Sequence, residues 1–216
     1  TTLLLSSFIA PSTFAEESKS FYLSVGGGIA FPSDIEADQT VGGTRTDVKF
    51  TTDDNPFTYS FALGKEFNDW RLEFNYSALT LSSDSWTATQ AGNGFTGTLS
   101  PDYEIEAKSY MIYGYKDINN SDSNLTPYFG IGLGTSNLHQ EAQTVSVSGT
   151  NVTLPSADES VFSYAVKGGI GYQIADNTTL YSEATYINYA SFTSDDNVNY
   201  DGNNHFGITA GLRFSF

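Results

Sequence analysis

The stretch "FALGKEFNDWRLEFNY", residues 61–76, contains two alternating patterns on either side of the dipeptide Asn68-Asp69. Before the dipeptide, every second residue from Phe61 to Phe67 is large and apolar, with the exception of Lys65. After the dipeptide, every second residue from Trp70 to Tyr76 is large and apolar. The positions between them carry small, polar or charged residues, including Arg71 and Glu73. A period of two residues is typical of a strand with two unlike faces, and a two-residue polar connection favours a hairpin. The stretch therefore predicts two antiparallel strands.

The same alternation recurs along the whole chain. Strands are predicted at 21–31, 57–67, 70–78, 103–116, 126–136, 160–174, 179–189 and 205–216. Short turns between them alternate with long polar connections, at about 32–56, 79–102, 137–159 and 190–204. An even number of strands, with short turns at one end and long loops at the other, is typical of a membrane barrel. We therefore expect an all-β fold, an eight-stranded antiparallel up-and-down transmembrane β-barrel.

Side-chain volume indicates which face points outward. The interior of an eight-stranded barrel is only just wide enough to be filled by side chains, so it cannot hold eight sets of large apolar residues. We expect these residues to face lipid and the small, polar residues to face the lumen. Aromatic girdles are expected at both ends of the barrel. Their predicted members are Phe67, Trp70, Tyr115 and Phe216 near the short turns, and Phe31, Tyr59 and Tyr189 near the long loops.

Charged residues recur on the predicted small face. They are Glu66, Arg71, Glu73, Glu106, Lys108, Lys167, Glu183 and Arg213, four cations against four anions in a chain with 9 basic and 25 acidic residues. A charge in a narrow lumen has to be paired, because an unpaired buried charge costs several kcal/mol. We therefore expect an ion-pair network in the lumen, with Arg213 bound to Glu73 or Glu66. The lumen tyrosines expected beside it are Tyr22, Tyr110, Tyr128 and Tyr181. A charged, solvated face is the alternative interpretation.

The beginning of the chain resembles a secretory signal. Leu3–Ala10 is an apolar run too short to span a bilayer as a helix, and Thr13-Phe14-Ala15 places small residues at a cleavage site. We expect cleavage between Ala15 and Glu16, so that 1–15 is a signal-peptide remnant and 16–216 is the barrel domain. A buried N-terminal strand or helix is the alternative.

Composition excludes several classes of function. A net charge of −16 disfavours nucleic acid as a partner, and the absence of cysteine excludes disulfides and cysteine-bound metals. No cofactor is expected. The acidic residues of the first long connection could bind divalent cations weakly, although a solvated acidic loop is the simpler interpretation. These residues are Asp34, Glu36, Asp38, Asp53 and Asp54.

Catalysis has little support in the sequence. The chain has two histidines, His139 and His205, and the second lies near Ser194, Asp195 and Asp196. These residue types are common in polar loops, and their order matches no hydrolase pattern. We therefore expect no enzymatic activity.

Several segments carry a family resemblance in their order and spacing. They are "SFYLSVGGGIAF" (20–31), the 61–76 pair, "TPYFGIGLG" (126–134), "AVKGGIGYQI" (165–174), "NTTLYSEATY" (177–186) and "GLRFSF" (211–216). Together they resemble the small eight-stranded bacterial outer-membrane β-barrels, the OmpA/OmpX/Opa-like group with a porin-family outer membrane protein beta-barrel domain. The resemblance implies an outer-membrane location, periplasmic termini and long loops outside. A barrel of this size usually needs no partner subunit, so we expect a monomer in contact with outer-membrane lipid. It also implies that Leu212, Phe214 and Phe216 resemble the signal that the barrel assembly machinery binds.

The sequence leaves the function open between different classes. The first hypothesis is a non-enzymatic protein with a structural or surface-interaction role through four long polar, acidic loops. The alternative is a narrow cation-favouring, porin-like channel for ions or small solutes, since an acidic mouth attracts cations.

Overall fold

The computed structural model describes residues 21–52, 55–118, 123–147, 150–154, 156–194 and 197–216. In these ranges the regular secondary structure consists of β-strands. No helix in the described part of the chain is long and apolar enough to cross a membrane.

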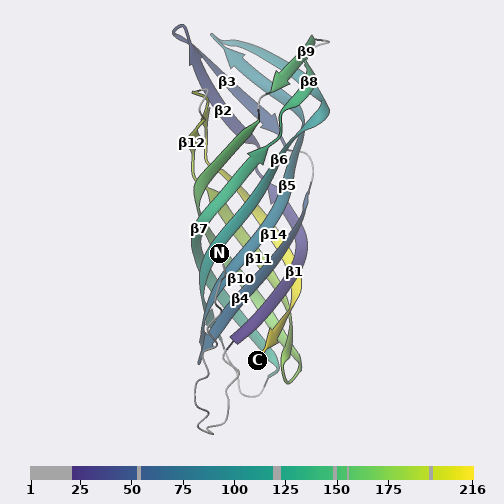
Figure 1. Cartoon of the computed structure of the whole chain (residues 1–216), viewed down its shortest axis with the longest axis vertical. Helices are drawn as coiled ribbons and strands as arrows, with labels where there is room; N and C mark the ends of the chain where they lie inside the picture. Colours follow the sequence, from purple (N-terminus) through teal and green to yellow (C-terminus); the bar gives the residue numbers. More distant parts are fainter. Residues whose placement is uncertain (1–20, 53–54, 119–122, 148–149, 155, 195–196) are drawn as a thin grey trace, which may run out of the picture.

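Within the described residues, eight strands form a closed antiparallel ring (Figure 1). Its members, in ring order, are β1 (Phe21–Pro32), β4 (Phe57–Phe67), β5 (Trp70–Gln90), β6 (Asn93–Asp117), β7 (Leu125–Gln140), β10 (Ala157–Ala175), β11 (Thr178–Tyr189) and β14 (Asn203–Ser215). The ring closes where β1 pairs with β14, so that Val25 lies opposite Leu212. The predicted up-and-down barrel is confirmed.

The alternation of the sequence is reproduced as two unlike faces. Leu72 and Phe74 on β5 are 52% and 51% exposed on the outside, whereas Arg71 and Glu73 are buried. The same holds on β7, where Ile131 is exposed and Gly132 is buried. The apolar face therefore points outward, and the small and polar face points into the barrel, as volume predicts.

The long connections differ from the expected polar loops. Much of their length is further β-structure, comprising β2 (Ile35–Val41), β3 (Thr44–Thr51), β8 (Gln143–Val147), β9 (Thr150–Leu154), β12 (Phe192–Thr193), β13 (Asn199–Tyr200) and the ends of β5 and β6. Two hairpins turn at Gly42-Gly43 and Ala91-Gly92, where all four residues have positive φ. Such turns match the twist of paired strands, so a polar segment can continue as a ribbon beyond the apolar band.

These extra strands build a wall above one end of the barrel (upper end in Figure 1). β5 is 21 residues long against 12 in β1, a difference of roughly 30 Å at the rise of a β-strand. β3 pairs with the distal part of β5, β2 pairs with β3, and β13 pairs with β2. We call this end the hairpin end, and the end with the Asn68-Asp69 turn the short-turn end.

The outer face changes from apolar to polar along β6. Ile112 and Tyr110 are exposed, and Lys108, Glu106 and Glu104 follow toward the hairpin end. Aromatic contacts mark this boundary, with ring centroids 5.3 Å apart in Tyr76–Tyr110, 6.3 Å in Tyr59–Tyr76 and 6.3 Å in Phe31–Phe206. The apolar band therefore ends at an aromatic belt, and the charged strand ends lie beyond it.

The prediction of the aromatic girdles is wrong for two of the seven residues, Tyr115 and Tyr189. Phe31, Tyr59, Phe67, Trp70 and Phe216 lie on the outer surface. In contrast, Tyr115 and Tyr189 are 1% and 2% exposed and point inward. The register is the reason, because Tyr115 lies opposite the inward Arg71, and Tyr189 lies opposite the inward Ser163.

Candidate functional site

Glu73 lies at the centre of a buried polar network near the short-turn end. Its carboxylate accepts hydrogen bonds from the hydroxyls of Tyr22 (2.9 Å) and Tyr115 (3.1 Å) and from the amide of Asn75 (3.2 Å). All four side chains are buried. The charge is therefore stabilised by three neutral donors from β1, β5 and β6, which is how a buried carboxylate can be satisfied without a cation.

Arg71 uses a partner that the sequence analysis missed. Its Nε donates to both carboxylate oxygens of Asp117, at 3.0 and 2.9 Å. The guanidinium also lies over the rings of Tyr115 and Tyr128, at 4.4 and 4.7 Å from their centroids. Asp117 is two residues after the inward Tyr115 on β6, so the strand period of two places both side chains on the same face. That spacing is the feature of the sequence from which Asp117 could have been predicted to face the lumen.

Arg213 is buried against tyrosine rings rather than paired with a carboxylate. Its guanidinium is 5.0, 5.6 and 5.8 Å from the ring centroids of Tyr22, Tyr128 and Tyr181. It takes part in none of the ion pairs between described residues, so the predicted pairing with Glu73 or Glu66 is wrong. Glu66 and Arg213 line the same polar recess at the short-turn end.

Two of the charged residues expected in the lumen, Lys167 on β10 and Glu183 on β11, form a buried ion pair. Lys167 Nζ lies 2.8 Å from Glu183 Oε1, and both side chains are less than 10% exposed. Lys167 also lies 4.3 Å from the centroid of the Tyr113 ring. The structure thus places Glu66, Arg71, Glu73, Lys167, Glu183 and Arg213 in the interior.

Glu106 and Lys108 lie outside the lumen, which corrects their predicted place in the network. They pair with each other at 2.7 Å on the outer wall, with side chains 35% and 37% exposed. The register explains the error, because Tyr113 lies opposite the inward Glu73, so odd-numbered residues of β6 point inward. Tyr110 also points outward for this reason.

Tightly packed side chains fill the middle of the barrel. Met111 has no exposed surface, and the hydroxyls of Ser109, Ser136 and Ser163 form a chain with spacings of 2.7 and 2.8 Å. His205 is buried nearby, with Nδ1 3.2 Å from the Tyr189 hydroxyl. The described interior is therefore occupied between the recess at the short-turn end and the hairpin end.

Inward tyrosines pack over glycines of the neighbouring strands. A Cβ added at Gly64 would overlap the ring of Tyr22, and one at Gly130 would overlap the ring of Tyr115. Each glycine is also the register partner of its tyrosine. Glycine provides the room that lets a large ring lie flat along the wall, so these pairs shape the filling of the lumen.

The remaining predicted residues fall in several places. Leu212, Phe214 and Phe216 lie on or directly after β14, and Phe216 N donates to Phe21 O at 2.8 Å. Their role in assembly stays a prediction. The expected cleavage site, Ala15 and Glu16, lies outside the described residues.

The acidic segment after β1 is partly neutralised by basic residues of β3. Lys49 Nζ lies 2.8 Å from Asp34 and 3.5 Å from Glu36, and Arg45 lies 3.5 Å from Asp38. The hydrogen bond from Lys49 lowers the pKa of Asp34, and the amide of Thr52 adds to this effect. The described residues contain no group of three metal-ligating side chains, while Asp53, Asp54, Asp195 and Asp196 lie outside them.

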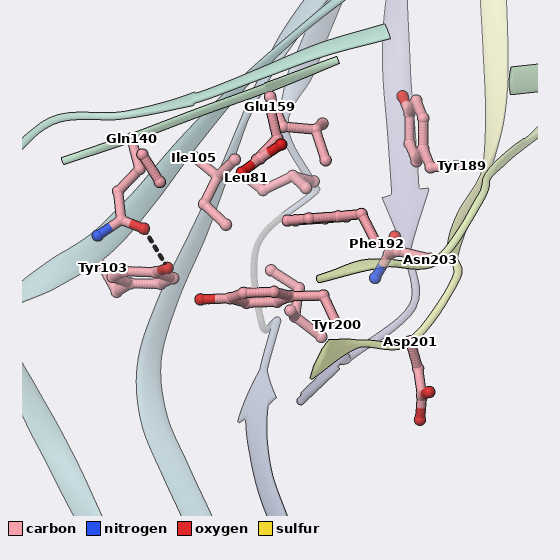
Figure 2. A pocket seen from close by; sticks show the side chains of 13 residues that line it. Leu81, Tyr103, Ile105, Gln140, Glu159, Tyr189, Phe192, Tyr200, Asp201 and Asn203 are labelled. Atoms are coloured by element: carbon pink, nitrogen blue, oxygen red, sulfur yellow. Dashed lines mark hydrogen bonds between the residues drawn. The ribbon is translucent and has the colours of Figure 1, made fainter. Parts of the chain in front are cut away.

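A narrow apolar pocket occupies the interior at the hairpin end (Figure 2). The cavity itself has a volume of about 50 Å³ and continues into an open mouth. Apolar side chains form most of the lining, namely Ile35, Leu81, Ile105, Leu138, Phe192 and Tyr200, and Tyr103, Gln140, Glu159, Tyr189 and Asn203 add polar groups. This pocket is not apparent from the sequence, because many of its lining residues lie in segments with the composition of polar loops.

Comparison with known proteins agrees with this architecture. No curated protein sequence matches the chain significantly. Neisserial surface protein A is similar in structure, with a TM-score of 0.56, 16% identity and coverage of 91% of this chain and 97% of that one. The outer membrane protein OprG from Pseudomonas aeruginosa gives a TM-score of 0.51, 12% identity and coverage of 91% and 96%. At these identities the likeness shows the fold alone.

The family is shown by the sequence itself. Residues 1–214 match the family described as "Outer membrane protein beta-barrel domain". That match covers nearly the whole chain and agrees with the closed ring, its apolar outer band and its polar interior. The chain therefore belongs to the outer membrane protein beta-barrel domain family, and its location is the outer membrane.

Proposed function

We propose that this protein is a non-enzymatic, closed barrel that holds an acidic β-structured extension on the cell surface for contacts with other molecules. The filled mid-barrel carries the proposal, because Met111, Ser136 and Ser163 have no exposed surface where a pore would need a water path. In this arrangement the barrel serves as an anchor in outer-membrane lipid, and the polar, acidic hairpin end makes the contacts.

The hairpin end is proposed to face outward from the cell, and both termini the periplasm. Short turns at one end and long connections at the other support this orientation. Exposed acidic residues with few basic neighbours lie on the ends of β5, β6 and β10 and directly after β7, among them Asp84, Asp102, Glu104, Asp158 and Glu141. A surface of this charge attracts basic partners, and salt weakens that attraction. A monomer assembled through the C-terminal signal is part of the same proposal.

Single-channel conductance tests the closed barrel directly. The refolded protein would be inserted into a planar bilayer, with insertion verified by heat-modifiable migration on gels. We expect no stable conductance steps across a range of salt concentrations, because the buried side chains leave no path. Stable, cation-selective steps would overturn the closed barrel and favour the narrow channel.

A trimmed variant tests the extension. Ser83 and Tyr103 are register partners, so residues 84–102 can be replaced by Asn-Gly while the barrel strands are kept. Supported bilayers with either protein would be exposed to fluorescent poly-lysine, a basic probe. We expect the full protein to retain more probe than the trimmed one at low salt, with the difference lost at high salt. Equal retention by two folded proteins would contradict the proposed role.

A further inference from the structure

The pocket at the hairpin end combines walls from distant parts of the chain. Leu81 lies opposite Ile105 in the β5–β6 pair, and Leu138 lies opposite Glu159 in the β7–β10 pair. These four residues share the inward face of the barrel, so the pocket is a continuation of the lumen above the aromatic belt. It is not part of the filled centre, nor of the outer acidic surface.

Two aromatic stacks border the pocket. Phe192 and Tyr200 stack with centroids 4.7 Å apart and planes at 10°, and Phe50 and Tyr103 stack at 4.9 Å and 19°. The first stack is tied to β2, because Tyr200 is the register partner of Ala37 and Asp201 N donates to Glu36 O at 2.9 Å. The flat rings are therefore held in place, and the pocket offers a preformed aromatic surface.

The polar groups in the pocket without a partner are hydrogen-bond acceptors. The Glu159 carboxylate takes part in none of the hydrogen bonds or ion pairs between described residues, although it lines an apolar space. The buried Oδ1 of Asn203 also has no partner among the described residues, while its Nδ2 donates to the carbonyls of Ser33 and Asp34 at 3.1 and 3.0 Å. In contrast, the Tyr103 hydroxyl is already bound to Gln140 at 2.5 Å.

Figure 2 shows how these groups are arranged. In this view Glu159 lies beside Leu81, above the rings of Phe192 and Tyr200. The Asp201 carboxylate points away from these rings. A carboxylate beside apolar walls gains most from a ligand that brings both a positive charge and apolar surface. A neutral apolar ligand would leave both acceptors unsatisfied, and an anion would be repelled by Glu159.

We propose that this pocket binds small amphiphilic cations, molecules with a flat apolar body and a protonated amine. The apolar body lies between the aliphatic side chains and the Phe192–Tyr200 stack. The ammonium group donates hydrogen bonds to the Glu159 carboxylate. The site is independent of the proposed surface role, since it lies inside the barrel wall.

Binding of phenethylamine to the refolded full chain in lipid nanodiscs tests the proposal. Methyl NMR signals of labelled leucine report on the pocket directly, because Leu81 and Leu138 line it. We expect concentration-dependent shifts of these two methyl groups with phenethylamine, weaker shifts with 2-phenylethanol and none with 3-phenylpropionate. Empty nanodiscs correct for partition of the probes into lipid.

Two substitutions identify the charged partner. Glu159→Gln should weaken phenethylamine binding by roughly tenfold or more, as expected for loss of a charge-assisted hydrogen bond. Glu104→Gln removes the same charge from the outer face of the same end and should leave the affinity unchanged. A third variant, Leu138→Trp, should abolish binding by filling the pocket.

Several outcomes would overturn the proposal. Folded protein that gives no leucine shifts with phenethylamine would do so, as would equal binding of 3-phenylpropionate. An equal loss of affinity in Glu159→Gln and Glu104→Gln would show attraction by the net charge rather than by the pocket. Native leucine spectra of each variant without ligand establish that it is folded.

Discussion

The Tyr22 hydroxyl donates a 2.9 Å hydrogen bond to Oε2 of Glu73, which lies 51 residues further along the chain. This bond joins β1 to β5 across the interior, with β4 between them in the ring. The same tyrosine ring lies 5.0 Å from the Arg213 guanidinium. A single side chain thus satisfies a buried anion with its hydroxyl and contacts a buried cation with its ring, so the lumen network consists of tyrosines as well as ion pairs.

Removing the Tyr22 hydroxyl should destabilise the barrel. In Tyr22→Phe, Glu73 loses one of its three donors, and a hydrogen bond to a charged group contributes about 1.5–3 kcal/mol. We expect the free energy of unfolding in urea, measured in lipid vesicles, to fall by about that amount. Tyr172→Phe is the control, because Tyr172 is 49% exposed on the outer face. Equal losses in both variants would contradict a specific role of the Tyr22–Glu73 bond.

The buried Lys167–Glu183 pair should show strong coupling. Lys167→Met leaves the Glu183 carboxylate buried without its cation, which costs about 3–5 kcal/mol. In the double variant Lys167→Met/Glu183→Gln no unpaired charge remains, so we expect most of that loss to be recovered. A double-mutant cycle in urea measures the coupling. Single losses that simply add would show that the two residues act independently.

A methyl group at Gly130 should disturb the lumen network from the neighbouring strand. In Gly130→Ala the new Cβ overlaps the Tyr115 ring, so the ring must shift and its contacts with Arg71 and Glu73 are disturbed. Overpacking of this kind costs about 1–3 kcal/mol in the free energy of unfolding. Gly168→Ala serves as the matched control on β10, because a Cβ there meets nothing within 4 Å. A loss of stability in Gly168→Ala as large as in Gly130→Ala would point to strand propensity instead.

The Asp34–Lys49 pair predicts a local pH dependence at the hairpin end. The hydrogen bond from Lys49 lowers the pKa of Asp34 below its ordinary value of 3.8. A lowered pKa in the folded state means that the pair contributes stability above that ordinary value and loses it as the pH falls through the lowered pKa. Carboxyl NMR titration should therefore give a low pKa for Asp34, and Lys49→Met should raise it. An unchanged Asp34 pKa in Lys49→Met would show that Lys49 is not the cause.

Much of the fold follows from local sequence. Alternation in segments such as 57–67 and 70–78 identifies strands, and the volume of the apolar residues indicates which face is outside. The same pattern predicts that five charged residues face the lumen, and the structure buries them there, namely Arg71, Glu73, Lys167, Glu183 and Arg213. The polar strand ends cannot be told from loops in this way, because polar alternation beyond the apolar band carries no hydrophobic signal.

A period of two residues and side-chain volume are local properties, and they are enough to specify a barrel with an apolar outside. The partner of each buried charge depends instead on how the strands pair and close in three dimensions. Pairing of β5 with β6 turns Tyr113 and Tyr115 inward and leaves Glu106 and Lys108 outside, since a shift of one residue exchanges the two faces of a strand. Closure of the ring brings Arg213 to tyrosines of β1, β7 and β11 rather than to a carboxylate. The pocket likewise exists only because residues of six or more strands converge at one end, a geometry that no single segment specifies.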